Sequence, residues 1–259
     1  MKKGKKLYEG KAKIIFSTND KNIVIQHFKD SATAFNNKKK ANIEGKGILN
    51  NRISEHILNN LNQVGIKNHL IKRINMREQL VKNVKIIPIE FIVRNIATGS
   101  ITKRLGIEDG TVLDHPLIEY CLKNDDLGDP LISREHILTF NWLDEESLNL
   151  INEKCKRIND FLQGMFRGVG IKLVDFKVEF GKTNENKIIL ADEISPDTCR
   201  LWDQNTEKKL DKDRFRNDLG DLVGSYQEVA RRLGILHEQS NIKPIKFEKL
   251  KEVKIKKNK

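Results

Sequence analysis

Cysteine and long apolar runs are scarce in this sequence of 259 residues. Its three cysteines, Cys121, Cys155 and Cys199, are odd in number and widely spaced, which excludes a disulfide framework and a CxxC zinc site. The apolar runs are far shorter than the ~20 residues that a membrane-spanning helix needs. Met1–Lys6 carries lysines but lacks the apolar segment of a signal peptide. We therefore expect a cytoplasmic protein without a membrane partner.

Positive charge is in excess, with a net charge of +12, and this would ordinarily suggest nucleic-acid binding. The distribution of the charge favours another interpretation. Residues 243–259 carry eight Lys and two Glu, so half of the excess lies in a terminal segment with little packing potential. No RNP, KH, zinc-finger or basic-zipper pattern accompanies it. We expect a solvated tail and no nucleic-acid partner, although a basic RNA-binding protein remains an alternative.

The length suits two lobes rather than one core, since domains typically hold roughly 100–150 residues. We expect an N-terminal nucleotide-binding lobe over 1–110, a C-terminal substrate and metal lobe over 111–241, and a basic tail over 242–259. Hydrophobic spacing predicts a series of elements in the first hundred residues. They are a hairpin at Leu7–Phe16 around Gly10, strands at Ile23–Phe28, Asn68–Ile74 and Val84–Asn95, and a helix through Leu49–Val64 that Gly65 ends.

The C-terminal half combines two amphipathic helices with a strand pair. Apolar residues recur at helical spacing from Leu148 to Met165, with Asp144 as N-cap, and again from Phe215 to Leu233. Between them, Lys172–Phe180 and Lys187–Glu193 indicate two strands joined by a polar turn. Residues 106–136 are rich in Pro, Gly and acids, so we expect a long functional loop or lobe connection there. The fold class is therefore α+β in two lobes.

The strand at Val174–Phe180 alternates apolar and charged residues. Successive strand side chains point to opposite faces, so Asp175, Lys177 and Glu179 share one face. Taken alone, this face could simply be exposed to solvent. The partner strand, however, ends in Asp192 and Glu193 and would bring them near Glu179. Carboxylates on adjacent strands near a nucleotide are what Mg²⁺ requires, because it prefers oxygen ligands and phosphates.

A second strand repeats this arrangement, since Glu90 and Arg94 share one face of the apolar segment Ile87–Arg94. Charges in such a strand are costly unless they are paired or solvated. A structural Glu–Arg pair is one explanation. The small-residue turn Asn95–Ser100 follows at once, and its amides with the Ser100 hydroxyl could hold an anion beside Arg94. The combination favours a phosphate or carboxylate site.

The predicted N-terminal hairpin places Lys11 and Lys13 on one face of a small-residue turn, Glu9–Lys13. Such a turn can close over nucleotide phosphates, although it matches neither GxxxxGK[ST] nor GxGxxG. Lysines at a hairpin tip are more often solvated. The nucleotide interpretation therefore depends on the rest of the chain.

Several segments together resemble the SAICAR synthetase family. The resemblance runs from about Lys6 to Leu236, and the two long central segments are highly specific. The segments are Leu7–Phe16 (LYEGKAKIIF), Ile86–Ser100 (IIPIEFIVRNIATGS), Leu173–Gly181 (LVDFKVEFG), Leu190–Asp203 (LADEISPDTCRLWD), Lys212–Arg216 (KDRFR) and Ala230–Gly234 (ARRLG). The resemblance implies two lobes with an ATP cleft between them, related to kinase or ATP-grasp clefts.

The resemblance also implies an activity, its substrates and a set of site residues. The implied reaction joins carboxyaminoimidazole ribonucleotide to L-aspartate with ATP and Mg²⁺, in a cytoplasmic homo-oligomer, most simply a dimer. The matching positions for ATP are Lys11, Ala12, Lys13, Lys123, Glu179 and Asp192. Those for the ribonucleotide are Glu90, Arg94, Ser100, Asp129 and Arg200, those for metal are Glu90, Asp129, Glu179 and Asp192, and those near the reacting end are Asp175, Lys177 and Asp197.

This crowd of charges suits the implied chemistry. A carboxylate is a poor electrophile, and its phosphorylation by ATP creates an acyl phosphate that an amine can attack. Another ATP-dependent carboxylate–amine ligase, or a small-molecule kinase, would share the acids but not the full Ile86–Ser100 and Leu190–Asp203 segments. Dependence on aspartate would separate these alternatives.

Overall fold

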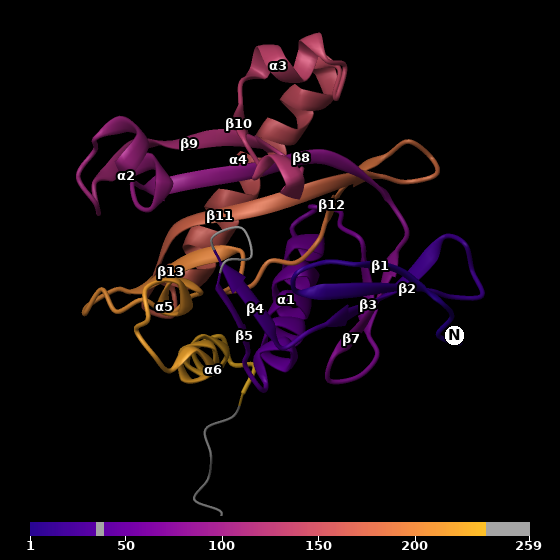
Figure 1. Ribbon diagram of the computed structural model, residues 1–259, viewed down its shortest axis with the longest axis horizontal. Coiled ribbons are helices and arrows are strands. Elements are labelled where there is room, and N and C mark those ends of the chain that lie inside the picture. The colour runs from indigo at the N-terminus through magenta and orange to yellow at the C-terminus, as the bar shows by residue number, and fades with distance from the viewer. Residues whose placement is uncertain (35–38, 237–259) are drawn as a thin grey trace, which may run out of the picture.

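The computed structural model describes residues 1–34 and 39–236, which fold into two main antiparallel sheets with helices packed against them (Figure 1). The mixed α and β content confirms the predicted class. Over the described ranges, no helix has both the length and the apolar character needed to cross a membrane. The predicted tail at 242–259 falls outside the described residues.

The first sheet is built from the N-terminal segment and has the strand order β1-β2-β3-β7-β6. Its strands are β1 (Lys6–Glu9), β2 (Lys13–Ser17), β3 (Ile23–Phe28), β7 (Glu78–Lys82) and β6 (Leu70–Arg73). The predicted hairpin around Gly10 is confirmed, since the Gly10 amide donates to the Lys13 carbonyl at 2.9 Å. A separate two-stranded ribbon pairs β4 (Ser31–Ala34) with β5 (Lys39–Asn42).

The second sheet has the order β10-β9-β8-β11-β12, and β13 also pairs with β11. Its strands are β8 (Lys85–Ile96), β9 (Val112–Leu122), β10 (Leu131–Ile132), β11 (Ile171–Lys182), β12 (Ile188–Ala191) and β13 (Cys199–Asp203). β12 and β13 share one edge of β11: Glu179 pairs with Ala191, and Phe176 pairs with Cys199. The segment between β12 and β13 is therefore a loop that lies beside β11 at that edge.

Two long helices, α1 (Lys46–Gln63) and α4 (Glu145–Arg167), supply much of the apolar packing. The shorter helices are α2 (Ser100–Leu105), α3 (Arg134–Thr139), α5 (Asp213–Arg216) and α6 (Leu222–Arg232), and Asp125–Leu127 forms a short 3-10 turn, η1. The predicted N-cap of α4 is confirmed, because the Ser147 amide donates to Asp144 Oδ1 at 2.7 Å. Helix α4 packs across β8, β9 and β11.

The apolar core is continuous between the two sheets. On α1, Ile53, Ile57 and Leu61 recur at helical spacing and are fully buried. On β11, Phe176 and Phe180 are buried in the same cluster. Burial of each such side chain stabilises the fold by about 1.5–3 kcal/mol. The main-chain pair from the His69 amide to the Leu190 carbonyl, 2.9 Å, also ties the β6 side to β12.

The predicted loop at 106–136 is wrong in its central part, which forms the long strand β9 and pairs with β8. Pro116 and the interspersed acids disguised the strand. The proline is tolerated because β9 pairs irregularly with β8 between Val112 and Leu117, while β10 reaches only Tyr120 and Cys121. The strand is an edge at that point.

The single helix predicted over Phe215–Leu233 is also wrong, since the structure divides it into α5 and α6. Asp218, Gly220 and Asp221 all have positive φ, which ends one helix and starts the next. Asp221 caps α6 by accepting from the Gly224 amide at 2.9 Å. The apolar spacing continued across this break by coincidence.

The change from the first sheet to the second falls between β7 and β8, near residue 84. The predicted lobe boundary at 110 was drawn from composition, and it stays a prediction. What the strand pairing adds is that Glu90 and Arg94, on β8, share a sheet with β11.

Candidate active site

One cavity of about 770 Å³ collects every side chain that the sequence predicted for the site. Its wall is formed by the N-terminal hairpin and first sheet on one side and by β8, β11 and the β12–β13 loop on the other. The predicted residues in its lining are Lys11, Ala12, Lys13, Glu90, Arg94, Ser100, Lys123, Asp129, Asp175, Lys177, Glu179, Asp192, Asp197 and Arg200. Segments distant in sequence thus meet at one place.

The polar face predicted for β8 and β11 is confirmed by the strand register. Arg94 lies opposite Asp175, and Glu90 lies opposite Glu179. Glu179 is 3% exposed and Asp175 is 4% exposed, so this face lines the cavity rather than open solvent. The alternative of an ordinary solvated strand face is therefore excluded.

The loop between β12 and β13 supplies the opposing acids. The Lys177 amide donates to the Thr198 carbonyl at 2.8 Å, which fixes the loop beside the middle of β11. Asp192, the first residue after β12, has φ of 62°, a left-handed conformation that non-glycine residues rarely adopt. Such conformations persist where the surrounding structure holds them, often at functional sites.

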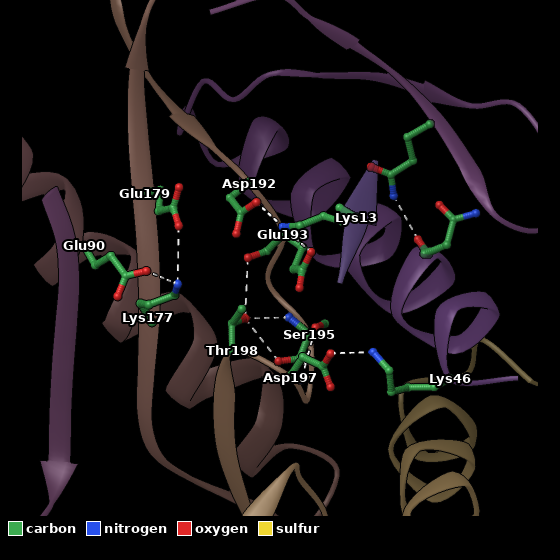
Figure 2. Close-up of polar contacts among 12 residues, drawn as sticks. Lys13, Lys46, Glu90, Lys177, Glu179, Asp192, Glu193, Ser195, Asp197 and Thr198 are labelled. Carbon is green, nitrogen blue, oxygen red and sulfur yellow. Dashed lines mark hydrogen bonds and ion pairs between the residues drawn. The ribbon is translucent and has the colours of Figure 1, made fainter. Parts of the chain in front are cut away.

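Lysines alternate with acids at one end of the cavity (Figure 2). The Lys177 ammonium contacts Glu90 and lies 3.3 Å from Glu179 Oε1. The Lys13 ammonium, from β2 of the first sheet, reaches across to Asp192 and Glu193. The two sheets are therefore joined electrostatically inside the cavity.

Two further lysines extend this cluster. Lys123 Nζ donates to Glu179 Oε1 at 2.7 Å. Lys11 Nζ donates to Asp125 Oδ1 at 2.7 Å and lies 3.8 Å from Asp129 Oδ2. Asp129 itself accepts from the Asn124 amide at 3.0 Å, which holds its carboxylate at the end of η1. The lysines predicted for phosphates are thus already close to carboxylates.

The charges in this cluster are fixed by one another. Burial would lower the pKa of Lys177, but Glu179 and Glu90 outweigh it and raise that pKa. Burial would raise the pKa of Asp192, but Lys13 and Lys177 lower it overall. Both groups are therefore ionised at neutral pH, and Lys177 can stabilise negative charge but cannot accept a proton.

The acids were also predicted to hold Mg²⁺. Across 1–34 and 39–236, no three His, Cys, Asp or Glu side chains gather closely enough to hold a metal ion unaided. Mg²⁺, however, is usually held by one or two carboxylates together with substrate phosphates. The ammonium groups of Lys13 and Lys123 contact Asp192 and Glu179, respectively, so positive charge already lies where a bound cation would lie. The donor set fits a magnesium–nucleotide complex.

The other end of the cavity contains a chain of alternating arginines and acids. Asp175 is its centre: Arg94 Nη1 and Arg200 Nη1 both donate to Asp175 Oδ2, at 2.8 and 2.7 Å. Arg94 Nε also donates to Glu119 Oε2 at 2.7 Å, and Arg200 Nε donates to Asp213 Oδ2 at 2.8 Å. Each arginine is held by two carboxylates, and its orientation is therefore fixed.

The turn before α2 closes over these arginines. Arg94 Nη2 donates to Ser100 Oγ at 3.2 Å. Gly99 has φ of 70°, and a Cβ at this position would lie 2.6 Å from Arg200 Nη2. Only glycine suits both the backbone conformation and the close approach. Two guanidinium groups and a hydroxyl consequently meet at one point, an arrangement that suits a phosphate.

Asp197 is held by groups that the sequence did not reveal. Lys46 Nζ donates to Asp197 Oδ2 at 2.7 Å, and Tyr226 Oη donates to Oδ1 at 2.6 Å (Figure 2 shows Lys46). Lys46 and Tyr226 are fully buried. Burial raises the pKa of Asp197, but Lys46 and Lys212 outweigh it and hold that pKa below its usual range. The carboxylate is therefore an ionised anchor between α1, α6 and the loop.

Sequence reasoning missed Lys46, Glu119, Asp213 and Tyr226. Lys46 begins α1, and helical spacing gives no sign that a lysine at a helix start is buried. Tyr226 was assigned to an apolar stripe, and Glu119 lay in the segment taken for a loop. Asp213 lay in the KDRFR segment, to which no role had been given. Its proximity to an arginine of the site could not be read from spacing alone.

Comparison with known proteins gives consistent results. The family model described as SAICAR synthetase matches residues 6–233. A protein from Pelagibacter ubique named phosphoribosylaminoimidazole-succinocarboxamide synthase is 72% identical over 257 residues, covering 98% of this chain and 99% of that protein. A protein of the same name from Sphingopyxis alaskensis is 58% identical over 92% of this chain and 93% of that protein.

Solved structures agree with the sequence comparisons. The crystal structure of phosphoribosylaminoimidazole-succinocarboxamide synthase from Ehrlichia chaffeensis superposes with a TM-score of 0.88 at 54% identity, covering 90% of this chain and 100% of that one. A SAICAR synthetase in complex with ADP superposes with a TM-score of 0.85 at 42% identity, covering 87% and 96% of the two chains. The likeness therefore extends over most of the chain.

Proposed function

The chain belongs to the SAICAR synthetase family, ATP-dependent ligases of purine biosynthesis, and we propose that its cavity condenses carboxyaminoimidazole ribonucleotide with L-aspartate. The observation that carries this proposal is the two-ended cavity, with lysines and acids at one end and a fixed arginine pair at the other. A relative of known structure binds ADP, which supports ATP as the phosphoryl donor.

We propose that the lysine–acid end binds the phosphates of ATP. Lys11, Lys13 and Lys123 would move from their carboxylates to the phosphate oxygens, which carry more charge. Glu179 and Asp192, freed in this exchange, would hold Mg²⁺ with the phosphates, and Glu90 and Asp129 would hold metal near the imidazole carboxylate. Bound Mg²⁺ would neutralise charge on the transferring phosphoryl group.

The arginine end would bind the phosphate of the ribonucleotide. Among the described residues, Arg94 Nη2 donates to Ser100 Oγ and Arg200 Nη2 has no hydrogen-bond partner, so both guanidinium groups have N–H groups to offer a phosphate. The close approach of Gly99 to Arg200 restricts the movement of that side chain. Asp175, predicted near the reacting end, accepts from both arginines. We therefore propose that Asp175 positions the arginines, and that Asp197 positions the loop through Lys46 and Tyr226.

The proposed reaction has two steps. An oxygen of the substrate carboxylate attacks the γ-phosphorus of ATP, which forms an acyl phosphate and releases ADP. The amine of L-aspartate then attacks the acyl carbon, loses a proton and expels inorganic phosphate, which leaves an amide. Lys177 would stabilise negative charge on the reacting oxygens, since its raised pKa keeps it protonated.

The proposal is tested by ADP release from purified protein with the ribonucleotide, with and without L-aspartate. Release that depends on aspartate supports the ligase, whereas release without it would indicate a kinase. Labelling both substrate carboxylate oxygens with ¹⁸O should deliver one label to inorganic phosphate per turnover. Unlabelled phosphate, or AMP as the nucleotide product, would contradict the acyl phosphate and the assigned roles of Lys11 and Lys13.

Assembly, location and domain limits are proposed in the same way. We propose a cytoplasmic homodimer with nucleotide-binding and substrate lobes over 1–110 and 111–241, followed by a tail that catalysis does not need. Light scattering tests the dimer. Truncation after Asn241 should leave ADP release within about twofold, as expected for a change away from the named mechanisms of destabilisation. Loss of active protein on truncation would show that the tail is required.

A further inference from the structure

Asp211 is a buried acid beside the arginine end of the cavity, and the proposed chemistry does not use it. The residue is fully buried in the segment between β13 and α5, and it lies outside the lining of the cavity. Within residues 1–34 and 39–236, no lysine, arginine or histidine forms an ion pair with it. A buried carboxyl group is costly unless hydrogen bonds satisfy it, so its partners indicate its role.

Both carboxyl oxygens of Asp211 accept from main-chain N–H groups. The Leu201 amide donates to Oδ2 at 2.8 Å, and the Asp213 amide donates to Oδ1 at 2.7 Å. The Leu210 amide also donates to the Leu201 carbonyl at 2.8 Å. The segment that carries Asp211 is therefore attached to β13 next to Arg200, and the carboxyl group connects that point to the first residue of α5.

The two main-chain groups that Asp211 holds belong to an arginine of the site and its partner. Arg200 directly precedes Leu201 on β13, and Arg200 Nε donates to Asp213 Oδ2 at 2.8 Å. A closed ring of contacts thus runs from Arg200 through Asp213 and Asp211 to the main chain at Leu201. The contact between Arg200 and Asp213 depends on the spacing of β13 and α5, which the two bonds of Asp211 fix.

Asp203 offers a comparison on the same strand. It is 8% exposed, and its Oδ1 accepts from two turn amides at 3.1 and 2.8 Å. Its ion pair is with Arg232, on the far side of β13 from the cavity lining. Both acids hold main-chain amides, but of the two it is Asp211 that holds the carboxylate partner of Arg200.

We propose that Asp211 is a positioning residue for the ribonucleotide phosphate, acting through Arg200 by holding Asp213 against its guanidinium group. The inference rests on the proposed function, in which Arg200 binds that phosphate. With Asp213 held in place, Nε of the arginine is occupied, and Nη1 donates to Asp175 at 2.7 Å. The guanidinium plane is then fixed, with Nη2 left for the phosphate. Loss of the Asp211 bonds lets Asp213 and the guanidinium group move together.

This role is tested with Asp211→Asn and Asp211→Ala at pH 8, with Asp203→Asn as the matched control. Burial raises the pKa of Asp211 to about 7, so at pH 8 the carboxylate is mostly ionised and can accept from both amides. Asn keeps one acceptor and Ala keeps none. KM for the ribonucleotide should therefore rise about 3- to 10-fold in the first variant and about 10- to 50-fold in the second, while kcat and KM for ATP change less than about 3-fold.

The control variant separates positioning from general destabilisation. Asp203→Asn weakens similar amide bonds, so it should lower the melting temperature but leave KM for the ribonucleotide within about twofold of wild type. An equal rise of KM in Asp203→Asn would overturn the positioning role. Asp213→Asn keeps the amide that Asp211 holds but weakens the contact with Arg200, and it should raise the same KM about 3- to 10-fold.

Two further measurements ask whether Asp211 acts through Arg200. In a chain that already carries Arg200→Met, Asp211→Asn should change KM for the ribonucleotide less than about 1.5-fold, because no guanidinium group remains to be positioned. Equal fold-changes in the two backgrounds would contradict the inference. The substrate riboside, which lacks the phosphate, should inhibit wild type and Asp211→Asn equally within about twofold. A loss of riboside binding as large as the loss for the ribonucleotide would also overturn it.

Failure of the positioning role can be distinguished from failure of the proposed function. Wild-type ADP release that needs neither the ribonucleotide nor L-aspartate would contradict the function, and the inference with it. Release that needs both substrates, with an unchanged KM for the ribonucleotide in Asp211→Asn, Asp211→Ala and Asp213→Asn, would leave the function standing and overturn the positioning role alone.

Discussion

Substitution of Asp175 by Asn separates a positioning role from a catalytic one. The side chain is 4% exposed, and its Oδ2 accepts from Arg94 and Arg200. Asn keeps the shape but removes the charge that these two arginines share. Hydrogen bonds to charged groups contribute about 1.5–3 kcal/mol and neutral ones about 0.5–1.5 kcal/mol, so two weakened bonds should cost about 2–3 kcal/mol in the free energy of unfolding.

The loss is bounded because the arginines keep other partners. Glu119 still holds Arg94, and Asp213 still holds Arg200. For a chain of this size, about 2–3 kcal/mol corresponds to a fall of about 4–12 °C in melting temperature. The arginines would also be less precisely oriented, so KM for the ribonucleotide should rise about 10-fold while kcat falls less than about 5-fold.

Thermal unfolding and steady-state kinetics of Asp175→Asn are measured together. Asp114→Asn, at an exposed position of β9 outside the cavity, is the matched control. If kcat falls by more than about 1000-fold while the melting temperature stays within about 1 °C of wild type, Asp175 takes part in the chemistry, and the positioning argument is refuted.

Three further predictions concern single residues. Asp192→Asn should lower kcat at least about 100-fold, because Lys13 and the proposed metal lose their charged partner; near-normal turnover at saturating Mg²⁺ would remove Asp192 from the site. Arg200→Lys should raise KM for the ribonucleotide about 5- to 100-fold, since the planar fork is lost, and an unchanged KM would contradict its role. Burial, followed by Asp213, raises the pKa of Asp211 to about 7. The unfolded residue titrates near 3.9, so the native state binds more protons between these values. The unfolding free energy should therefore fall as pH rises from about 4 to 7, and Asp211→Asn should reduce that slope; identical slopes would contradict the shifted pKa.

Strand alternation explains why so much of the cavity could be predicted. A strand with charges at every second position must direct them to one face, and β8 and β11 do so in matching register. That argument placed Glu90, Arg94 and Glu179 on strand faces without any knowledge that β8 pairs with β11. It needed only that the apolar faces pack together, which the buried Phe91, Phe180 and neighbouring residues do.

Pattern alone failed where tertiary contacts decide the structure. β9 carries Pro116 and several acids, yet it is a strand because β8 offers it an edge to pair with. Lys46 is buried because Asp197, far along the chain, meets it. The helical spacing of apolar residues continues past Asp218 and Gly220, although left-handed backbone at these residues separates α5 from α6. For β9 and Lys46 the deciding partner is distant in sequence, so local spacing cannot reveal it, whereas at Asp218 and Gly220 the apolar spacing hides a local change of backbone conformation.

The same strand register also sets a length scale for the substrate. Asp175 and Glu179 are four residues apart on β11, and they pair with Arg94 and Glu90, also four apart on β8. At about 3.3 Å per residue, the arginine end and the lysine–acid end are separated by roughly 13 Å along the strands. In the proposed site, a ribonucleotide would lie along this interval with its phosphate at the arginines and its carboxylate toward Lys177, which is two residues from each end. A shift of two residues in the pairing of β8 with β11 would keep every side chain on its face but separate Arg94 from Asp175 and Glu90 from Glu179. Register, and not the polar face alone, therefore determines whether the two ends can act on one substrate.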